Sequence, residues 1–108
     1  MTEKFENSII GKYRGERTID GVVVTFNGIP ITSKLPNLEN FNFSFEWGYE
    51  GEGPLNLAYA LILHSRRDAA QADKYSNNLM GRLISKLSND WEIDSDELEK
   101  FIRQDSND

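Results

Sequence analysis

The order of apolar and polar positions separates a strand-rich first part of the chain from a helical second part. In residues 11–31, the dipeptides Asp20-Gly21 and Asn27-Gly28 tolerate the positive φ angles of tight hairpin turns. A β-branched and aromatic run lies between them. Pro30 favours an edge position for its strand, because proline cannot donate to a ladder. This pattern predicts a small antiparallel meander.

An alternation of aromatic with polar or small residues follows a predicted loop at residues 32–40. Its aromatic members are Phe41, Phe43, Phe45, Trp47 and Tyr49. A period of two places all five on one face of an extended segment, where so much aromatic area usually covers a core. Directly afterwards, Gly53 suits the N-cap of a helix and Pro54 its first position. The segment therefore predicts a strand that turns into a helix.

Three helices are expected after this turn. Residues 55–65, LNLAYALILHS, are apolar nearly all round, which is typical of a buried central helix. Asp68 can cap a second helix, whose apolar positions recur at three- and four-residue steps. After a short link at 88–93, Asp94 or Ser95 can cap a third helix with acids in its first turn.

These elements predict an α+β fold, in which a small antiparallel meander of three to four strands is followed by three helices. A length of 108 residues is that of one domain. We expect this single domain to span residues 11–104, with a flexible arm at 1–10 and a frayed tail at 105–108.

The formal net charge of −6 changes the picture of an ordinary soluble domain, because all of it lies at one end. Residues 90–108 hold eight acids and two bases, whereas residues 1–89 hold ten of each. Phosphate backbones attract Lys and Arg, so general nucleic-acid binding is disfavoured. Acids in the first turn of a helix are ordinary helix design, but these acids could also imitate a phosphate array and face a protein partner. The candidates are Asp90, Glu92, Asp94, Asp96, Glu97 and Glu99.

The residue content excludes several classes of protein. The chain has no cysteine, which excludes disulfides, thiolate nucleophiles and cysteine-ligated metal centres and fits a reducing compartment. No run approaches the roughly 18 apolar residues that cross a bilayer, and the first residues lack the apolar core of a secretory signal. We therefore expect a cytoplasmic protein without membrane contact and without a cofactor.

The turn GYEGEGP allows two interpretations. A glycine-rich turn into a helix can bind phosphate, but a P-loop needs Lys-Ser/Thr where this chain has Pro54-Leu55. Its two glutamates would also repel a phosphate. A structural turn is favoured, and the alternative is a site for a small ligand or a hard cation, although the spacing is not that of an EF-hand. The candidate binding residues are Glu46, Trp47, Tyr49, Glu50 and Glu52.

Three further features could carry chemistry. His64 is the only histidine, and its place near the end of a helix is typical of a capping or exposed imidazole. The basic segment KYRGER, residues 12–17, could contact nucleic acid or an acidic partner, but a charged, exposed hairpin edge is the more common role. An enzyme acting through Glu46 would need a second, paired acid, which the sequence does not identify. We therefore expect no catalytic activity.

The stretch FEWGYEGEGPLNLAYALIL resembles the signature of an uncharacterised family of small proteins from bacteria, archaea and phages, F-E-W-G-Y-x-G-x-G-P followed by a leucine- and alanine-rich helix. The matching residues are Phe45, Glu46, Trp47, Gly48, Tyr49, Gly51, Gly53 and Pro54, then Leu57, Ala58 and Leu61. Weaker matches, Tyr13 to Gly15 and Trp91, extend the resemblance to about residues 12–103. Glu52 stands where the family has a small residue, which argues against an anion-binding role for the turn.

The resemblance implies no reaction, but it implies that some members are associated with phages or mobile elements. By analogy, we expect a small acidic, non-catalytic interaction protein that binds and modulates, or inhibits, a host protein complex such as a defence system. The alternative is a small-ligand or cation-binding module that uses the turn from Trp47 to Pro54. An enzyme acting through carboxylates ranks last.

Overall fold

The computed structural model of this chain describes residues 10–34 and 45–106. Its elements, in chain order, are β1 (Lys12–Thr18), β2 (Gly21–Phe26), β3 (Ile29–Pro30), the 3-10 helix η1 (Ile31–Lys34), α2 (Glu52–Arg66), α3 (Ala69–Arg82), the 3-10 helix η3 (Ile84–Lys86), β4 (Trp91–Asp94) and α4 (Ser95–Ser106). A four-stranded antiparallel sheet and three α-helices form one α+β domain, which confirms the predicted fold class. The expected arm, apart from Ile10, and the last two residues of the expected tail lie outside the described residues.

The strand order in the sheet is β3-β2-β1-β4. β4 lies where the sequence predicts only a link, and it pairs antiparallel with β1, from Lys12 opposite Asp94 to Gly15 opposite Trp91. The fourth strand therefore follows α3 and does not belong to the N-terminal meander, which corrects the expected order of strands first and helices afterwards. Its apolar residues alternate with acids, so one face of β4 suits the core and the other suits water.

Both predicted hairpin turns form, but only one uses the predicted residues. Asn27 (φ 52°) and Gly28 (φ 87°) make the tight turn between β2 and β3, as expected. In the β1–β2 hairpin the two central residues are Ile19 and Asp20, so the prediction of Asp20-Gly21 was wrong by one position. Gly21 comes next, with a φ of 121° that favours glycine.

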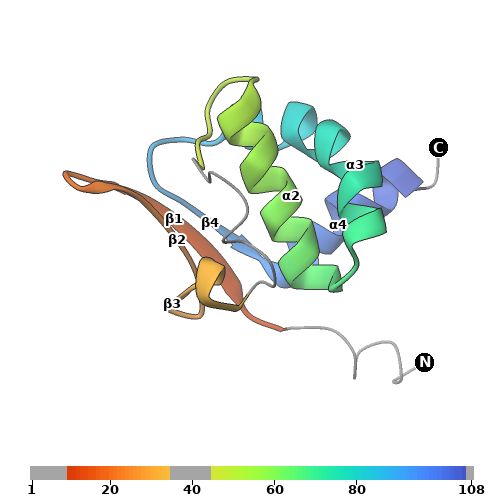
Figure 1. The fold of residues 1–108 in the computed structure, drawn as a ribbon, viewed down its shortest axis with the longest axis horizontal. Helices are drawn as coiled ribbons and strands as arrows, with labels where there is room; N and C mark the ends of the chain where they lie inside the picture. The colour runs from red at the N-terminus through yellow and green to blue at the C-terminus, as the bar shows by residue number, and fades with distance from the viewer. Residues whose placement is uncertain (1–9, 35–44, 107–108) are drawn as a thin grey trace.

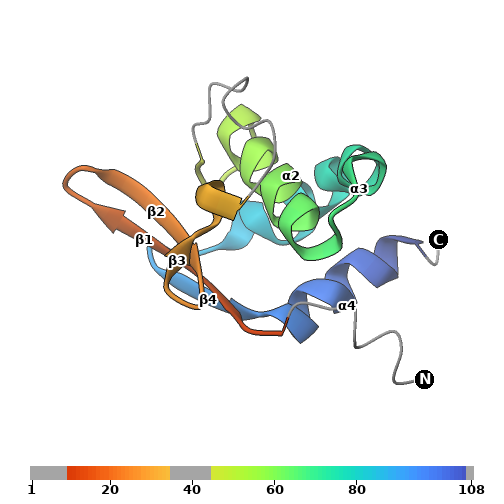
Figure 2. The ribbon, with the colours of Figure 1, turned by 60° about the horizontal axis from the view of Figure 1, so that its bottom comes forward.

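The helices lie on one side of the sheet (Figure 1), and the turned view in Figure 2 shows the same two layers. We call the sheet face toward the helices the inner face; its residues include Tyr13, Gly15, Arg17, Val24, Trp91 and Ile93. We call the opposite side the outer face; its residues are Lys12, Arg14, Glu16, Val23, Thr25, Glu92 and Asp94. The alternation of buried and exposed residues from Lys12 to Gly15 and along β4 follows this division. Arg17 is more exposed, and its guanidinium lies over the Trp47 ring.

α2 is the central helix of the core, as its nearly continuous apolar sequence predicts. Five consecutive residues, Ala60 to His64, are buried. The helix begins at Glu52 with Gly51 as its N-cap, two residues before the predicted cap at Gly53. Pro54 is then its third residue, and proline is tolerated there because the first four N–H groups of a helix have no intrahelical partner. Among the described residues, no helix is both long and apolar enough to cross a membrane.

The other two helices begin close to their predicted caps. The Asp68 carboxylate accepts hydrogen bonds from the N–H groups of Ala70 (2.9 Å) and Gln71 (3.3 Å), which confirms it as the N-cap of α3. α4 begins at Ser95, whose hydroxyl accepts a hydrogen bond from the Gly11 N–H (3.1 Å) and so extends the contact between β1 and β4. α4 continues to residue 106, two residues into the expected tail.

Candidate functional site

The segment FEWGY, residues 45–49, is irregular in the structure, so this described part of the predicted strand does not form. Phe45 and Trp47 are buried, with 8% and 1% exposure, as the alternation predicts, but Tyr49 is 50% exposed and does not belong to the core. The alternation ends at Gly48, because its φ of 89° turns the backbone out of the extended conformation. Residues 41–44 of the predicted aromatic face lie outside the described residues.

Backbone hydrogen bonds hold this segment between α2 and η3. The Glu46 N–H donates to the Gly53 carbonyl (3.3 Å), in the first turn of α2, and the Gly48 N–H donates to the Ile84 carbonyl (3.0 Å), in η3. An irregular segment can be buried only when its polar backbone groups find such partners. The motif is therefore a fixed joint between two helical elements.

Trp47 lies at the centre of this joint. Its indole N–H donates to the carbonyl of Asn89 (3.1 Å), and its ring meets that of Trp91 edge to face at 5.5 Å. Trp91 in turn covers Gly15, where a Cβ atom would lie 2.3 Å from the Trp91 ring. Only glycine fits at that position of β1, which gives a packing reason for the glycine in the Tyr13–Gly15 element.

Arg17, in β1, connects this joint to the sheet. Its guanidinium lies 4.7 Å from the Trp47 ring centroid, donates to the Trp47 carbonyl (3.1 Å) and pairs with the Glu46 carboxylate (2.7 Å). Its Nε donates to the Asn89 side chain (3.3 Å), and its backbone N–H donates to the Asp90 carboxylate (3.2 Å). Glu46, a candidate binding residue, is thus engaged inside the fold.

We expect Arg17→Ala to lower the free energy of unfolding by about 1–3 kcal/mol, because it removes these hydrogen bonds and uncovers the Trp47 ring. Urea unfolding followed by tryptophan fluorescence measures the change. Arg14→Ala is the matched control: its ion pairs with Glu16 and Glu92 lie on the outer face, where exposed pairs contribute under about 1 kcal/mol. Equal effects of the two variants would contradict a structural role for Arg17.

The remaining candidates at the turn do not gather around a ligand. Glu50 and Glu52 are exposed, and the Tyr49 ring lies over Gly51, where a Cβ atom would be 2.9 Å from the ring. In residues 10–34 and 45–106, no three histidine, aspartate or glutamate side chains are placed to hold a metal ion. Glu46, Glu50 and Glu52 therefore do not form a joint cation site.

His64 is buried at 3% exposure, so the expectation of a capping or exposed imidazole was wrong. Its Nδ1 is hydrogen-bonded to the Tyr13 hydroxyl (2.8 Å), and the two rings pack edge to face and against Phe26. Burial, together with the smaller effect of the nearby Arg67 guanidinium, lowers the pKa of His64 to about 4. Burial also raises the pKa of Tyr13. Both groups are therefore neutral at pH 7 and closed off from solvent.

The six acids expected to face a partner have different environments. Glu99 receives two hydrogen bonds from the Arg66 guanidinium (2.8 and 3.0 Å) and one from the Ser65 hydroxyl (3.0 Å), so it joins α4 to α2. Glu92 and Asp94 lie 3.5 and 3.8 Å from the Lys12 ammonium group on the outer face. These three acids already have partners within the fold.

The other three acids are more open. Asp90 is exposed and accepts the backbone hydrogen bond of Arg17 described above. Asp96 and Glu97 are exposed in the first turn of α4, where negative charge stabilises a helix N-terminus. The structure therefore does not collect all six carboxylates into one unpaired surface.

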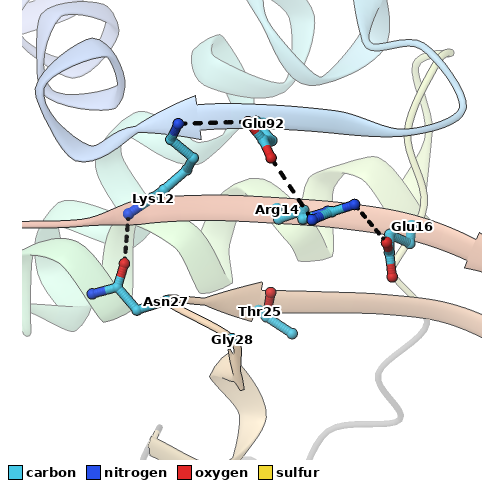
Figure 3. A pocket seen from close by; sticks show the side chains of 7 residues that line it. All are labelled: Lys12, Arg14, Glu16, Thr25, Asn27, Gly28 and Glu92. Atoms are coloured by element: carbon cyan, nitrogen blue, oxygen red, sulfur yellow. Dashed lines mark hydrogen bonds and ion pairs between the residues drawn. The ribbon is translucent and has the colours of Figure 1, made fainter.

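The basic segment KYRGER divides between the two faces of the sheet. Tyr13 and Arg17 face the helices, whereas Lys12 and Arg14 lie on the outer face beside Glu16 and Glu92 (Figure 3). There, Arg14 pairs with Glu16 (2.9 Å) and Glu92 (3.8 Å). A hollow of about 370 Å³ lies among these charges; its lining residues are Lys12, Arg14, Glu16, Thr25, Asn27, Gly28 and Glu92.

The sequence analysis did not identify Arg17 as the residue that connects the FEWGY segment to the sheet. It also did not identify the charged outer face. The available signal was the period of two within KYRGER, which places Lys12, Arg14 and Glu16 on one face and Arg17 on the other. The contacts of Arg17 with Glu46 and Asn89 depend on distant segments, and no local pattern shows them.

Comparison with known proteins gives a family but no activity. The sequence profile of a family of unknown function (DUF6166) matches residues 13–104, from the second residue of β1 to two residues before the end of α4. No curated protein and no solved structure matches the chain.

Proposed function

The chain belongs to DUF6166, a family of unknown function, and we propose that it is a small non-catalytic protein that binds a protein partner through the outer face of its sheet. The observation that carries the proposal is the asymmetry of the sheet. Helices cover its inner face, whereas within residues 10–34 and 45–106 no element covers its outer face (Figures 1 and 2). That face presents a charged hollow of about 370 Å³.

The charges of the outer face suit a protein partner. Lys12 and Arg14 lie in one row on β1, and Glu92 and Asp94 lie beside them on β4. Their ion pairs are 3.5 to 3.8 Å long and about half exposed. Such pairs contribute little to stability, so the same groups can exchange their present contacts for complementary charges on a partner. Val23 adds an exposed apolar side chain.

His64 and Glu46, the two side chains considered above for catalysis, are both engaged within the fold, which supports the non-catalytic part of the proposal. His64 and Tyr13 are bonded to each other in the core, where a substrate cannot reach them. Glu46 is held by Arg17. Phe45, Glu46 and Trp47 of the FEWGY motif thus serve the fold, which leaves the function to the exposed surface.

We also propose that the protein acts in the cytoplasm and comes from a phage or mobile element. The absence of cysteine supports action in a reducing cytoplasm. The resemblance described above, an FEWGY-x-G-x-GP signature shared by bacteria, archaea and phages, supports a phage or mobile-element origin. A protein of that origin would act on a host complex such as a defence system, and covering a working surface of that complex would inhibit it.

Affinity capture with the tagged full-length chain tests this function. We expect a discrete protein from host lysate to be retained in stoichiometric amount, with and without nuclease, and to be identified by mass spectrometry. A partner lost on nuclease treatment would instead indicate that nucleic acid mediates the contact. Capture of nothing above the level of an unrelated bait would refute the proposal.

Two charge-reversal variants assign the surface. Arg14→Glu changes the centre of the outer face, whereas Lys74→Glu makes the same change at an exposed site on α3, in the helical layer. We expect Arg14→Glu to reduce the retained partner several-fold and Lys74→Glu to leave it unchanged. Equal retention by both variants would show that the partner does not bind the outer face.

A further inference from the structure

The tip of the β1–β2 hairpin is an exposed feature that the sheet itself does not require. β4 pairs with β1 only as far as Gly15, and β3 pairs with β2 only at Thr25 and Phe26. Residues 16–24, which we call the hairpin arm, therefore extend beyond both neighbouring strands. Figures 1 and 2 show the arm reaching away from the helices.

Ile19 is at the end of this arm and is fully exposed. Turn positions favour Gly, Pro, Asn, Asp and Ser, each for a conformational or hydrogen-bonding reason, and a β-branched apolar residue offers none of them. Single exposed apolar residues are common on protein surfaces. Here, however, the side chain lies in the two-residue turn at the tip of the hairpin and contributes no packing to the fold.

The hairpin arm is ordered by its own contacts. The Thr18 hydroxyl donates to the Gly21 carbonyl (2.6 Å) and accepts from the Asp20 N–H (3.2 Å), which closes the turn around Ile19. At the base of the arm, Arg17 is held by the joint described above. An anchor residue on a preordered arm loses little conformational entropy on binding, which favours affinity.

From these contacts we infer that Ile19 is the apolar anchor with which the chain enters a pocket of its protein partner, an inference that rests on the proposed function. A side chain at the end of a narrow arm fits a concave apolar site better than a flat one. Such buried anchors carry most of the binding energy in protein interfaces. The outer face then supplies the polar surroundings of the contact.

The charge beside Ile19 predicts the charge at the rim of the partner's pocket. Asp20 is exposed next to Ile19, and no base within residues 10–34 and 45–106 forms an ion pair with it. A lysine or arginine at the rim of the pocket would complement it. The same carboxylate, together with the net charge of −6, disfavours an anionic lipid surface or a second copy of this chain as the occupant.

Variants of the tip test the inference on the full-length chain. We expect Ile19→Asp to reduce retention of the captured partner at least about tenfold, the loss typical of an anchor. Ile19→Val should keep most of the binding, and Asp20→Lys should weaken it several-fold. Asn77→Asp, which adds the same carboxylate at an exposed position of α3, is the matched control and should change nothing. Urea midpoints confirm that each variant is folded.

Photo-crosslinking gives a readout of contact. Benzoylphenylalanine is placed at position 19 in one chain and at position 77 in another, each is irradiated in host lysate, and the crosslinked peptides are sequenced. Support requires that position 19, and not position 77, labels residues that line an apolar pocket in the captured partner. Labelling of lipid, of a second copy of this chain, or of nothing above the level of position 77 would overturn the inference.

The two proposals fail in different ways. Capture of the same partner by the wild type and by Ile19→Asp in equal amounts refutes the anchor and leaves the proposed function standing. Capture of no partner by the wild type refutes both.

Discussion

Trp47→Ala is expected to lower the free energy of unfolding by about 3–5 kcal/mol, the cost of deleting a large buried aromatic side chain. The indole is 1% exposed, packs against Trp91 and donates to the Asn89 carbonyl. Its removal leaves a cavity, an unpaired carbonyl and an Arg17 side chain without the ring beneath it. Small domains are typically stable by about 5–15 kcal/mol, so this change removes a large share of the total.

Urea unfolding followed by far-UV circular dichroism measures this loss, because the variant keeps only one tryptophan for fluorescence. Tyr49→Ala is the matched control from the same motif: its ring is half exposed, so we expect a cost below about 1 kcal/mol. If Trp47→Ala proved as stable as Tyr49→Ala, the motif would not be a structural joint, and a ligand site at the turn would again become the better interpretation.

His64 is expected to make the protein sensitive to acid. Its pKa is about 4 in the folded chain, below the ordinary value of 6.5, so the unfolded chain takes up the proton at a higher pH. The stability that depends on neutral His64 is complete above about pH 6.5 and is lost as the pH falls through 6.5 toward 4. Between about pH 7.5 and 4.5 this loss amounts to about 2–3 kcal/mol.

His64→Gln isolates this contribution, because glutamine can still form a hydrogen bond with Tyr13 but does not titrate. Urea unfolding of both proteins at the two pH values gives the comparison. We expect the variant to be less stable than the wild type at neutral pH and to lose about 2–3 kcal/mol less on acidification. The same pH dependence in both proteins would show that protonation of the imidazole does not oppose folding.

The three helices could be predicted from sequence because their signals are local. Asp68 is a cap whose partners lie two and three residues away, and the apolar spacing after it belongs to a single helix. The formation of β4, in contrast, does not depend on local signals alone. Its four residues, WEID, do alternate, but a strand this short exists only through its pairing with β1 at the other end of the chain.

In the aromatic motif, the two-residue alternation predicts burial correctly only as far as Trp47. Phe45 and Trp47 obey the alternation, but Gly48 changes the backbone direction and leaves Tyr49 half exposed. The buried environment of His64 could not be predicted either, because a single histidine in a helix gives no sign that Tyr13 of β1 lies opposite it. What sequence could not supply, at the turn and at the histidine alike, was the identity of partners from distant segments.

The pairing of β1 with β4 also sets the order in which a newly made chain can become a folded one. While the ribosome is still extending the chain, the β1–β2 hairpin and the α2–α3 pair can form from nearby segments. Gly15 has no Trp91 to cover it, and the Trp47 indole has no Asn89 carbonyl, until residues 89–91 have emerged. Until then, the nascent protein exposes an open aromatic surface to chaperones and proteases. A chain truncated before Trp91 cannot close its core, and the cell can recognise it as a substrate for degradation.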